Sequence, residues 1–164
     1  MEALPVYKSY LEGKMTKRPF VAKGNRSKEV LELVHSDLCG PMNIQARGGF
    51  EYFITFIDDY SRYGYIYLMR RKSECFEKFR LFKVETKNRH GKCMKTLRSN
   101  RGGEYLLGEF MDYLSDKGVE SQLFILGMPQ QNDVANRKNR TLMDMVKSMM
   151  SYSDLPNLFW GHAL

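Results

Sequence analysis

The sequence predicts a mixed α/β fold, in which an antiparallel meander of three strands is extended by two strands that cross over through helices. Two observations favour this class. Three runs rich in β-branched and aromatic residues follow one another within residues 30–69, and beyond Arg71 helical and strand-like segments alternate. With 164 residues and 43% apolar side chains, the chain is long enough for a single core.

The first segment of the chain is basic and the last is helical. Residues 1–28 contain seven Lys and Arg with little apolar periodicity, so we expect an extended basic arm there. Residues 29–164 are expected to form one core domain. Residues 155–164 start another helix that has no stop signal, which predicts that the domain is truncated at its C-terminal end.

Three strands are predicted in the first half of the domain. The first run, residues 30–38, ends before a glycine-proline pair and has Asp37 near its end. The next two runs follow a Gly-Gly turn and are separated by a short polar turn. They are expected to be antiparallel strands at residues 50–58 and 63–69.

Helices and strands alternate in the second half. Apolar residues at helical spacing mark two helices that end near Gly91 and Gly118, and strands follow at about residues 93–98 and 119–125. A long helix begins after a polar loop at residues 127–132. The apolar residues that we expect to face the core from this helix are Val134, Leu142, Met145, Val146, Met149 and Met150.

Charge and cysteine content limit the function classes. The chain has 26 Lys and Arg against 19 Asp and Glu, a net charge of +7, which favours anionic partners such as nucleic acid. No apolar run is long enough for a membrane span and no secretory signal is present. The cysteines Cys39, Cys75 and Cys93 are unpaired in sequence, which predicts free thiols in an intracellular compartment, cytoplasm or nucleus.

Three positions could form a site. Asp37 lies near the end of the first strand and Asn100 lies at the tip of the fourth. Asn136 lies at the start of the long helix, with 35 residues between it and Asn100. Such strand ends are where α/β folds place their sites. An isolated Asn in a turn or at a helix start more often has only a local structural role.

Four motifs occur in order: His35-Ser-Asp37, the segment 56–62, the segment 97–105 and the segment 129–141. Together they make the chain, from about Lys14 to its end, similar to the integrase core of Ty1/copia-type retrotransposons. The resemblance implies a ribonuclease-H-like fold, that is, a mixed five-stranded sheet flanked by helices. It also implies DNA integration by two metal ions, normally Mg²⁺, held by an Asp, Asp, Glu triad.

The chain departs from this triad at two of its three positions. Asp37 matches the first catalytic aspartate and is the one charged metal ligand expected here. Asn100 stands where the family has Asp, and Asn136 stands where it has Glu. An amide oxygen can ligate magnesium but brings no charge to offset a pair of cations. We therefore expect a degenerate, catalytically inactive core with weak or absent Mg²⁺ binding.

Other acids could rebuild the site. Glu104 and Asp133 follow Asn100 and precede Asn136, and either could approach Asp37. The pair Asp58 and Asp59 ends a neighbouring strand, where a solvated position is the simpler expectation. The enzymatic alternative is thus an active nuclease or strand transferase with a rearranged metal site.

Binding is the function expected to survive. Asn136, Arg140, Met143 and Lys147 recur at a spacing near four, which places them on one stripe of the long helix. The cationic side chains that could meet DNA phosphates are Arg137, Lys138, Arg140 and Lys147, although a solvated helix face would look the same. A further alternative is a non-catalytic interaction module that forms a homodimer.

The basic arm also departs from the family. Related chains carry a Cys-x-x-Cys pair of a zinc module before the sequence Leu11-Glu-Gly-Lys-Met, whereas this chain has Tyr7 and Tyr10 there. Zinc requires thiolate or imidazole ligands. The arm is therefore expected to be the remnant of a zinc-binding module and to bind no zinc.

Overall fold

A five-stranded mixed sheet forms the centre of the computed structural model, which describes residues 26–100, 102–123 and 133–164. The strands lie in the order β3-β2-β1-β4-β5. The pairs β1/β2 and β2/β3 are antiparallel, and the pairs β1/β4 and β4/β5 are parallel. The strand bounds are Leu33–Cys39 (β1), Tyr52–Asp58 (β2), Gly64–Met69 (β3), Thr96–Ser99 (β4) and Glu120–Leu123 (β5).

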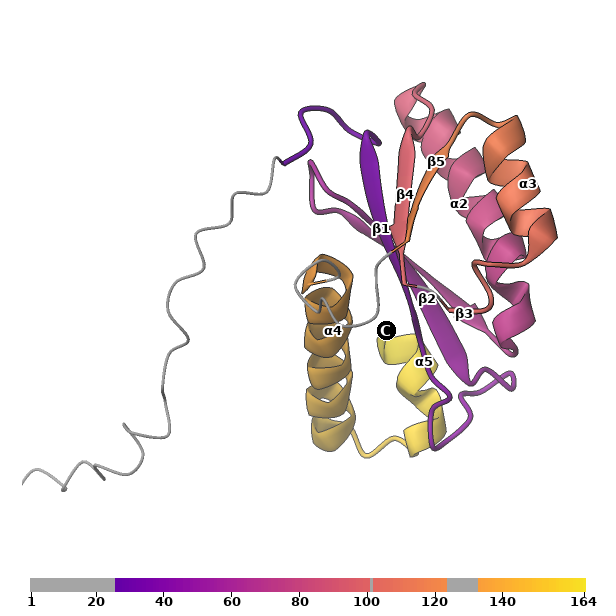
Figure 1. The fold of residues 1–164 in the computed structure, drawn as a ribbon. Coiled ribbons are helices and arrows are strands. Elements are labelled where there is room, and N and C mark those ends of the chain that lie inside the picture. The colour runs from indigo at the N-terminus through magenta and orange to yellow at the C-terminus, as the bar shows by residue number, and fades with distance from the viewer. Residues whose placement is uncertain (1–25, 101, 124–132) are drawn as a thin grey trace, which may run out of the picture.

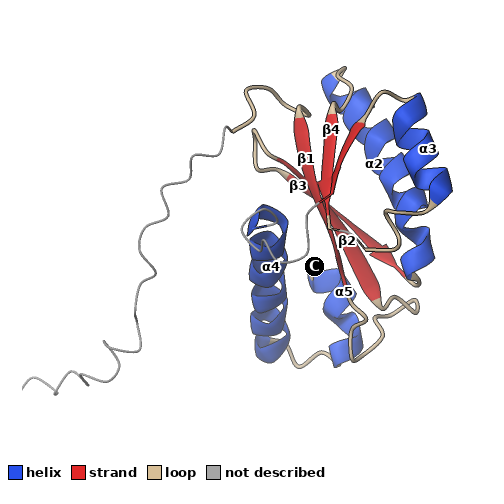
Figure 2. Ribbon diagram, in the orientation of Figure 1, coloured by secondary structure: helices blue, strands red, loops and turns tan. Residues whose placement is uncertain are grey.

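Helices cover both faces of the sheet (Figures 1 and 2). Two of them, α2 and α3, lie on one face, while α4 and α5 lie on the other. The helix bounds are Cys75–His90 (α2), Gly108–Asp116 (α3), Asp133–Tyr152 (α4) and Trp160–Ala163 (α5), with single 3₁₀ turns at Lys72–Glu74 and Asn157–Phe159. The predicted mixed sheet with flanking helices is confirmed, whereas the expected basic arm lies outside the described residues apart from positions 26–28.

The first strand begins three residues later than predicted, and the reason is local. Leu31 adopts a positive φ of 66°, and its side chain is buried in the core instead of continuing the strand. Its backbone N–H donates to the Asp58 carboxylate at 2.7 Å. The chain therefore turns at Leu31 before β1 starts.

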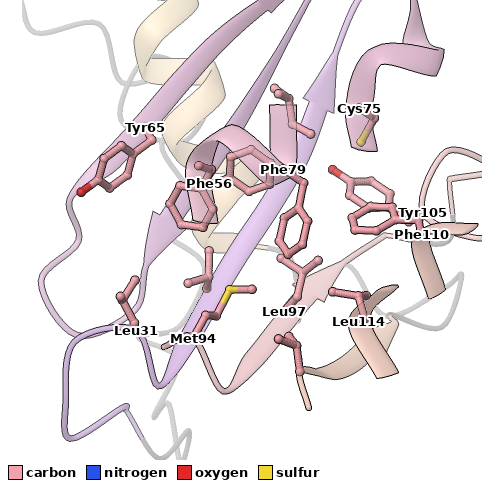
Figure 3. Packing of buried hydrophobic residues seen from close by; sticks show 14 of the residues in the cluster. Leu31, Phe56, Tyr65, Cys75, Phe79, Met94, Leu97, Tyr105, Phe110 and Leu114 are labelled. Carbon is pink, nitrogen blue, oxygen red and sulfur yellow. The ribbon is translucent and has the colours of Figure 1, made fainter. Parts of the chain in front are cut away.

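Aromatic side chains fill the larger core cluster, between the sheet and the α2/α3 layer (Figure 3). Phe56 of β2 stacks on Phe82 of α2 with ring centroids 4.6 Å apart, and Phe79 lies 4.9 Å from Phe110 of α3. All four rings are at most 1% exposed. Offset and tilted ring pairs of this kind add to the stabilisation from burial, so this cluster joins both helices to the sheet.

A smaller cluster holds α4 and α5 on the opposite face. Val146 of α4 packs with Phe53 of β2, Ala46 and Trp160, and the Trp160 indole N–H donates to the backbone carbonyl of Ile44 at 2.7 Å. Such a bond satisfies the one polar atom of a buried tryptophan. The C-terminal segment is thereby fixed against the sheet.

Two expectations for the long helix are wrong. Met145 and Met149, predicted to face the core, are 54% and 44% exposed. Met143, predicted to lie on the solvated basic stripe, is partly buried against the smaller cluster. The buried residues of α4 are instead Ala135, Asn139 and Val146. One polar side chain, Asn139, therefore faces the sheet.

Candidate functional site: an amide-bonded aspartate

The middle of β1 places Asp37 on the sheet face that α4 covers. Val34 of β1 packs in the larger cluster under α2 and α3, so alternation along the strand turns Asp37 to the opposite face. The antiparallel register pairs Asp37 with Thr55 of β2. The parallel register that pairs His35 with Arg98 of β4, continued two residues further, sets Asn100 beside Asp37.

Both carboxylate oxygens of Asp37 accept hydrogen bonds from amides. Asn100 Nδ2 donates to Asp37 Oδ1 at 3.3 Å, and Asn139 Nδ2 donates to Asp37 Oδ2 at 3.0 Å. Asp37 is 8% exposed and Asn139 is 5% exposed. The structure therefore brings Asp37 and Asn100 together, as predicted, and adds a third residue from α4.

The side-chain oxygen of each of these two asparagines also accepts a hydrogen bond. Asn100 Oδ1 accepts the backbone N–H of Gly102 at 3.0 Å, which forms a tight turn after β4. Asn139 Oδ1 accepts the hydroxyl of Thr55 at 2.9 Å. Because a carboxylate has no hydrogen to donate, the NH₂ group of each amide has to face Asp37. These partners fix the orientation of both asparagines.

Burial raises the pKa of Asp37 to about 6, since desolvation disfavours the charged carboxylate and the nearby negative charge of Glu104 acts in the same direction. The Asn139 amide and the backbone N–H of Leu38 oppose this shift by bonding the ionised form. Asp37 is consequently a carboxylate at neutral pH, in the protonation state that its two amide donors require.

Asn136 occupies a different place from its expected partners. Its side chain is exposed on α4, and the contact from α4 to Asp37 is made by Asn139, one helical turn further along. Sequence reasoning missed Asn139. A signal existed, because Ala135, Asn139 and Val146 recur at helical spacing and Asn139 is the polar member of an otherwise apolar stripe.

Tyr105 anchors the segment that follows Asn100. Its ring is 2% exposed, its backbone N–H donates to the carbonyl of Gly102 at 3.0 Å, and its hydroxyl lies 2.7 Å from the hydroxyl of Ser36. Ser36 is the neighbour of Asp37 in β1. The turn carrying Asn100 is thus tied to the central strand at both of its ends.

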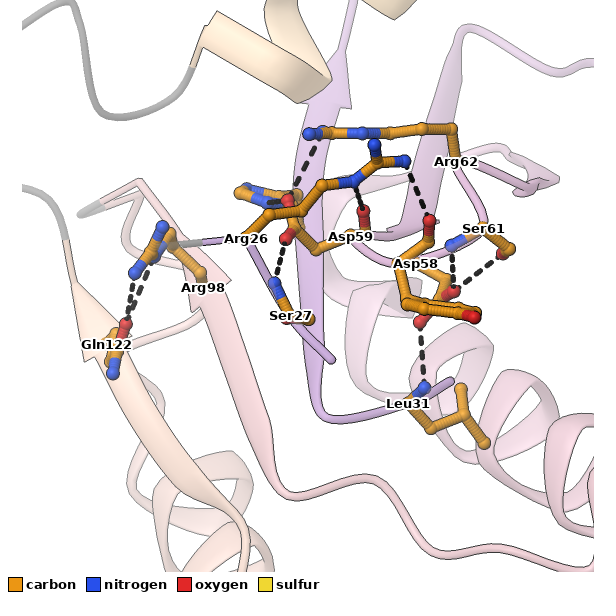
Figure 4. A network of polar contacts seen from close by, with 11 residues as sticks. Arg26, Ser27, Leu31, Asp58, Asp59, Ser61, Arg62, Arg98 and Gln122 are labelled. Atoms are coloured by element: carbon orange, nitrogen blue, oxygen red, sulfur yellow. Dashed lines mark hydrogen bonds and ion pairs between the residues drawn. The ribbon is translucent and has the colours of Figure 1, made fainter. Parts of the chain in front are cut away.

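Asp58 is buried, which corrects the expectation of a solvated strand end. It is 3% exposed, and one of its oxygens accepts the N–H of Leu31. The other oxygen accepts the N–H and the hydroxyl of Ser61 at 2.7 and 2.6 Å (Figure 4). Both oxygens are therefore used by the turn after β2 and by the chain before β1.

Asp59 is likewise buried and bonded, at 5% exposure. It accepts His35 Nε2 at 2.9 Å and the N–H of Ser27 at 2.9 Å, and it forms an ion pair with Arg62 at 3.2 Å. Burial alone would raise the pKa of Asp59, but these donors outweigh it and lower the pKa. Burial lowers the pKa of His35, so the neutral ring donates its N–H to Asp59.

Of the acids considered as substitutes, Asp58 and Asp59 are bonded to groups other than Asp37. Among residues 26–100, 102–123 and 133–164, no three His, Cys, Asp or Glu side chains are grouped as a metal ion would require. Glu104 is near enough for its charge to act on Asp37. The side chain of Asp133 is not among those that the structure describes, and neither are Tyr7 and Tyr10 of the arm.

The cationic side chains predicted to meet phosphates lie on the outside of α4. Arg137, Lys138, Arg140 and Lys147 are all exposed. Lys138 lies near the start of β3, where its aliphatic stem approaches Gly64. The helix therefore presents positive charge from its first turns to its middle, over the same face of the sheet as Asp37.

The sequence of this chain is similar to parts of several curated polyproteins. It is 42% identical over 154 residues to the Retrovirus-related Pol polyprotein from transposon TNT 1-94 of Nicotiana tabacum, covering 94% of this chain. The chain is therefore homologous, over nearly its whole length, to a segment of Ty1/copia-type Pol polyproteins. The Pol polyprotein from transposon RE2 of Arabidopsis thaliana is 29% identical over 92% of this chain. The Ty1-NL2 Gag-Pol polyprotein of Saccharomyces cerevisiae is 28% identical over 94%.

The chain spans about a tenth of the curated relatives it matches, between 9% and 12% of their length. A solved structure of similar fold is the simian T-cell lymphotropic virus intasome in complex with PP2A regulatory subunit B56 gamma, with a TM-score of 0.66. The match covers 85% of this chain and 49% of that one at 15% identity, and it supports the ribonuclease-H-like fold. No protein-family model matches the chain. In the described part, no helix has the length and apolar character needed to cross a membrane.

Proposed function

We propose that this chain is a nucleic-acid-binding integrase core that neither cuts nor joins DNA strands. The observation that carries the proposal is the surroundings of Asp37. It is the one acid at the three predicted triad positions, and its two oxygens face the N–H groups of Asn100 and Asn139. A catalytic pair of cations would need carboxylates at this point.

The donor set around Asp37 does not fit two divalent cations. Such a pair is normally bridged and neutralised by several carboxylates, whereas Asp37 supplies a single negative charge. Asn100 could offer a neutral oxygen, but that oxygen is already bonded to Gly102. We therefore expect weak or absent Mg²⁺ binding. We also expect that Asn136 occupies the position of the third acid of the triad. We expect no zinc in an arm that has Tyr7 and Tyr10 in place of cysteines.

Nucleic-acid binding is supported by the charge on α4. Four exposed cations on one helix can neutralise phosphates without any metal ion, and the net charge of +7 favours the encounter. Contacts of this type carry little sequence information. The proposed binding is therefore weak, tolerant of sequence and sensitive to salt.

The catalytic part of the proposal is tested by strand-transfer and nicking assays in Mg²⁺ and in Mn²⁺. The expected result is no product above that of a heat-denatured control. Activity that disappears in the Asp37→Ala variant would refute the proposal and support an active enzyme with a rearranged site. Within the structure, Asp58 and Asp59 are poor candidates for such a site because their oxygens are already bonded.

The binding part is tested by fluorescence anisotropy with a short labelled duplex at several salt concentrations. The double variant Arg140→Gln with Lys147→Gln should bind more weakly and show a salt slope smaller by about 2, since each phosphate contact contributes about 0.9. The matched control is Arg80→Gln with Lys87→Gln, which removes the same charge from exposed positions on α2, beyond the opposite face of the sheet. Equal losses in both double variants would contradict a binding role for α4.

Pairing of two copies stays a prediction. Met145, Met149 and Tyr152 are exposed at helical spacing on α4, and Tyr152 is 89% exposed. Light scattering after size-exclusion chromatography across a range of concentrations measures the oligomeric state. A monomer at every concentration would rule out the homodimer.

A further inference from the structure

The site around Asp37 is closed by hydrogen bonds that the protein makes with itself. Four side chains take part: Asp37 from β1, Thr55 from β2, Asn100 from the end of β4 and Asn139 from α4. We infer that this set is a metal-independent junction, which holds α4 and the β4 turn against the centre of the sheet. The inference concerns stability and does not depend on nucleic-acid binding.

The pairing within the junction is complementary. The two oxygens of Asp37 each accept from one amide, and the amide oxygens accept from Gly102 and Thr55. Buried polar networks stabilise and define a structure when every group is paired, and they are costly when a group is left without a partner. In this junction a donor meets an acceptor at each of the four contacts.

A cation would have to compete with these bonds. The amide hydrogens that point at Asp37 carry partial positive charge, and they occupy the oxygens that a metal ion would bind. Magnesium demands oxygen ligands at about 2.0–2.1 Å in near-octahedral geometry. To supply them, Asn100 and Asn139 would have to turn their oxygens inward and leave Gly102 and Thr55 without partners. The expected consequence is that divalent cations and chelators leave the stability of the folded chain unchanged.

A matched pair of variants tests the junction by thermal unfolding. Asn139→Ala removes the bonds to Asp37 and Thr55, and should lower the melting temperature by roughly 5 °C. Asn136→Ala removes the same side chain from an exposed position one turn earlier on α4 and should change it by less than about 1 °C. Asn100→Ala leaves α4 untouched and keeps the test decisive if Asn139→Ala does not fold. Equal melting temperatures for all three variants would overturn the inference.

Metal response gives the second readout. The wild-type melting temperature should be the same in MgCl₂, in MnCl₂ and in EDTA. Asn139→Asp places a second carboxylate about 3 Å from Asp37, so it should melt lower in EDTA and recover when MnCl₂ binds the folded state. A rise of several degrees for the wild type with either metal would overturn the inference. Strand-transfer activity tests the proposed function separately, so either can fail without the other.

Discussion

Replacing Asp58 by alanine should destabilise the fold more than any single change at the surface. The Asp58 carboxylate joins the turn after β2 to the chain before β1 through the N–H groups of Leu31 and Ser61 and the hydroxyl of Ser61. Leu31 is 1% exposed, so its N–H would find no water in place of the lost oxygen. A buried donor left unpaired costs about 1–3 kcal/mol. Because Ser61 is more exposed, we expect a total loss of about 3 kcal/mol.

The intermediate variant Asp58→Asn sharpens this prediction. Asparagine keeps one acceptor oxygen, but its NH₂ group would face either the N–H of Leu31 or the N–H of Ser61. Its expected cost is therefore about half that of alanine, or about 1–2 kcal/mol. The expected order of stability is wild type, then Asp58→Asn, then Asp58→Ala.

Urea unfolding followed by tryptophan fluorescence measures these differences. Trp160 is the single tryptophan of the chain and is 7% exposed in the smaller cluster, on the opposite side of the sheet from Leu31, so the variants leave the probe itself intact. The control is Asp112→Ala, which removes an exposed aspartate from α3 and should change stability by less than about 0.5 kcal/mol. If Asp58→Ala lost no more than this control, the reasoning from buried donors would be refuted.

Three further predictions concern the site. The pKa of Asp37 is raised to about 6 from 3.8, so the folded state holds the Asp37 proton more tightly than the unfolded state does. This proton's contribution to the free energy of unfolding is complete below pH 4 and is lost as pH rises through 6. Urea unfolding from pH 4 to 7 should therefore show wild type losing about 2–3 kcal/mol relative to Asp37→Asn, and parallel curves would contradict it. Tyr105→Phe leaves the Ser36 hydroxyl without its partner and should cost about 1 kcal/mol in the same assay; no loss would be inconsistent with an anchoring role. The double variant Asn100→Asp with Asn136→Glu adds two negative charges near α4 and should weaken duplex binding in EDTA severalfold by anisotropy, whereas unchanged binding would place the DNA elsewhere.

The elements of the sheet could be predicted from the sequence because their signals are local. Alternation of apolar residues and the Gly-Gly turn locate β2 and β3, and Gly91, with a φ of 63°, ends α2 where the sequence predicted. Asp37 and Asn100 could be paired in advance because each ends or follows a strand, and parallel neighbours bring such ends together. These features depend on residues close together in sequence.

The rest depends on how separate elements are set against each other. The rotation of α4 decides that Asn139 reaches Asp37 while Met145 is exposed. The stripe of Ala135, Asn139 and Val146 is compatible with this rotation, but the methionines on the other face of the helix offer a competing apolar stripe. Asp58 and Asp59 resemble an ordinary polar turn in sequence. Their burial arises because residues 26–31 fold back over that turn, 27 or more positions away in the chain.

The proposed loss of the acidic triad is compatible with retention of the fold because Asn100 and Asn139 both bond Asp37. Three acids around an empty site repel one another, and that repulsion opposes folding unless cations are bound. With amides at positions 100 and 139, the same backbone geometry is held by hydrogen bonds to the one remaining carboxylate. With fewer carboxylates on the sheet face that α4 covers, less negative charge offsets the cations of α4. This favours phosphates as partners. The proposed inactive core would therefore remain folded through the bonds of Asn100 and Asn139 to Asp37, and the exposed cations of α4 would still attract nucleic acid.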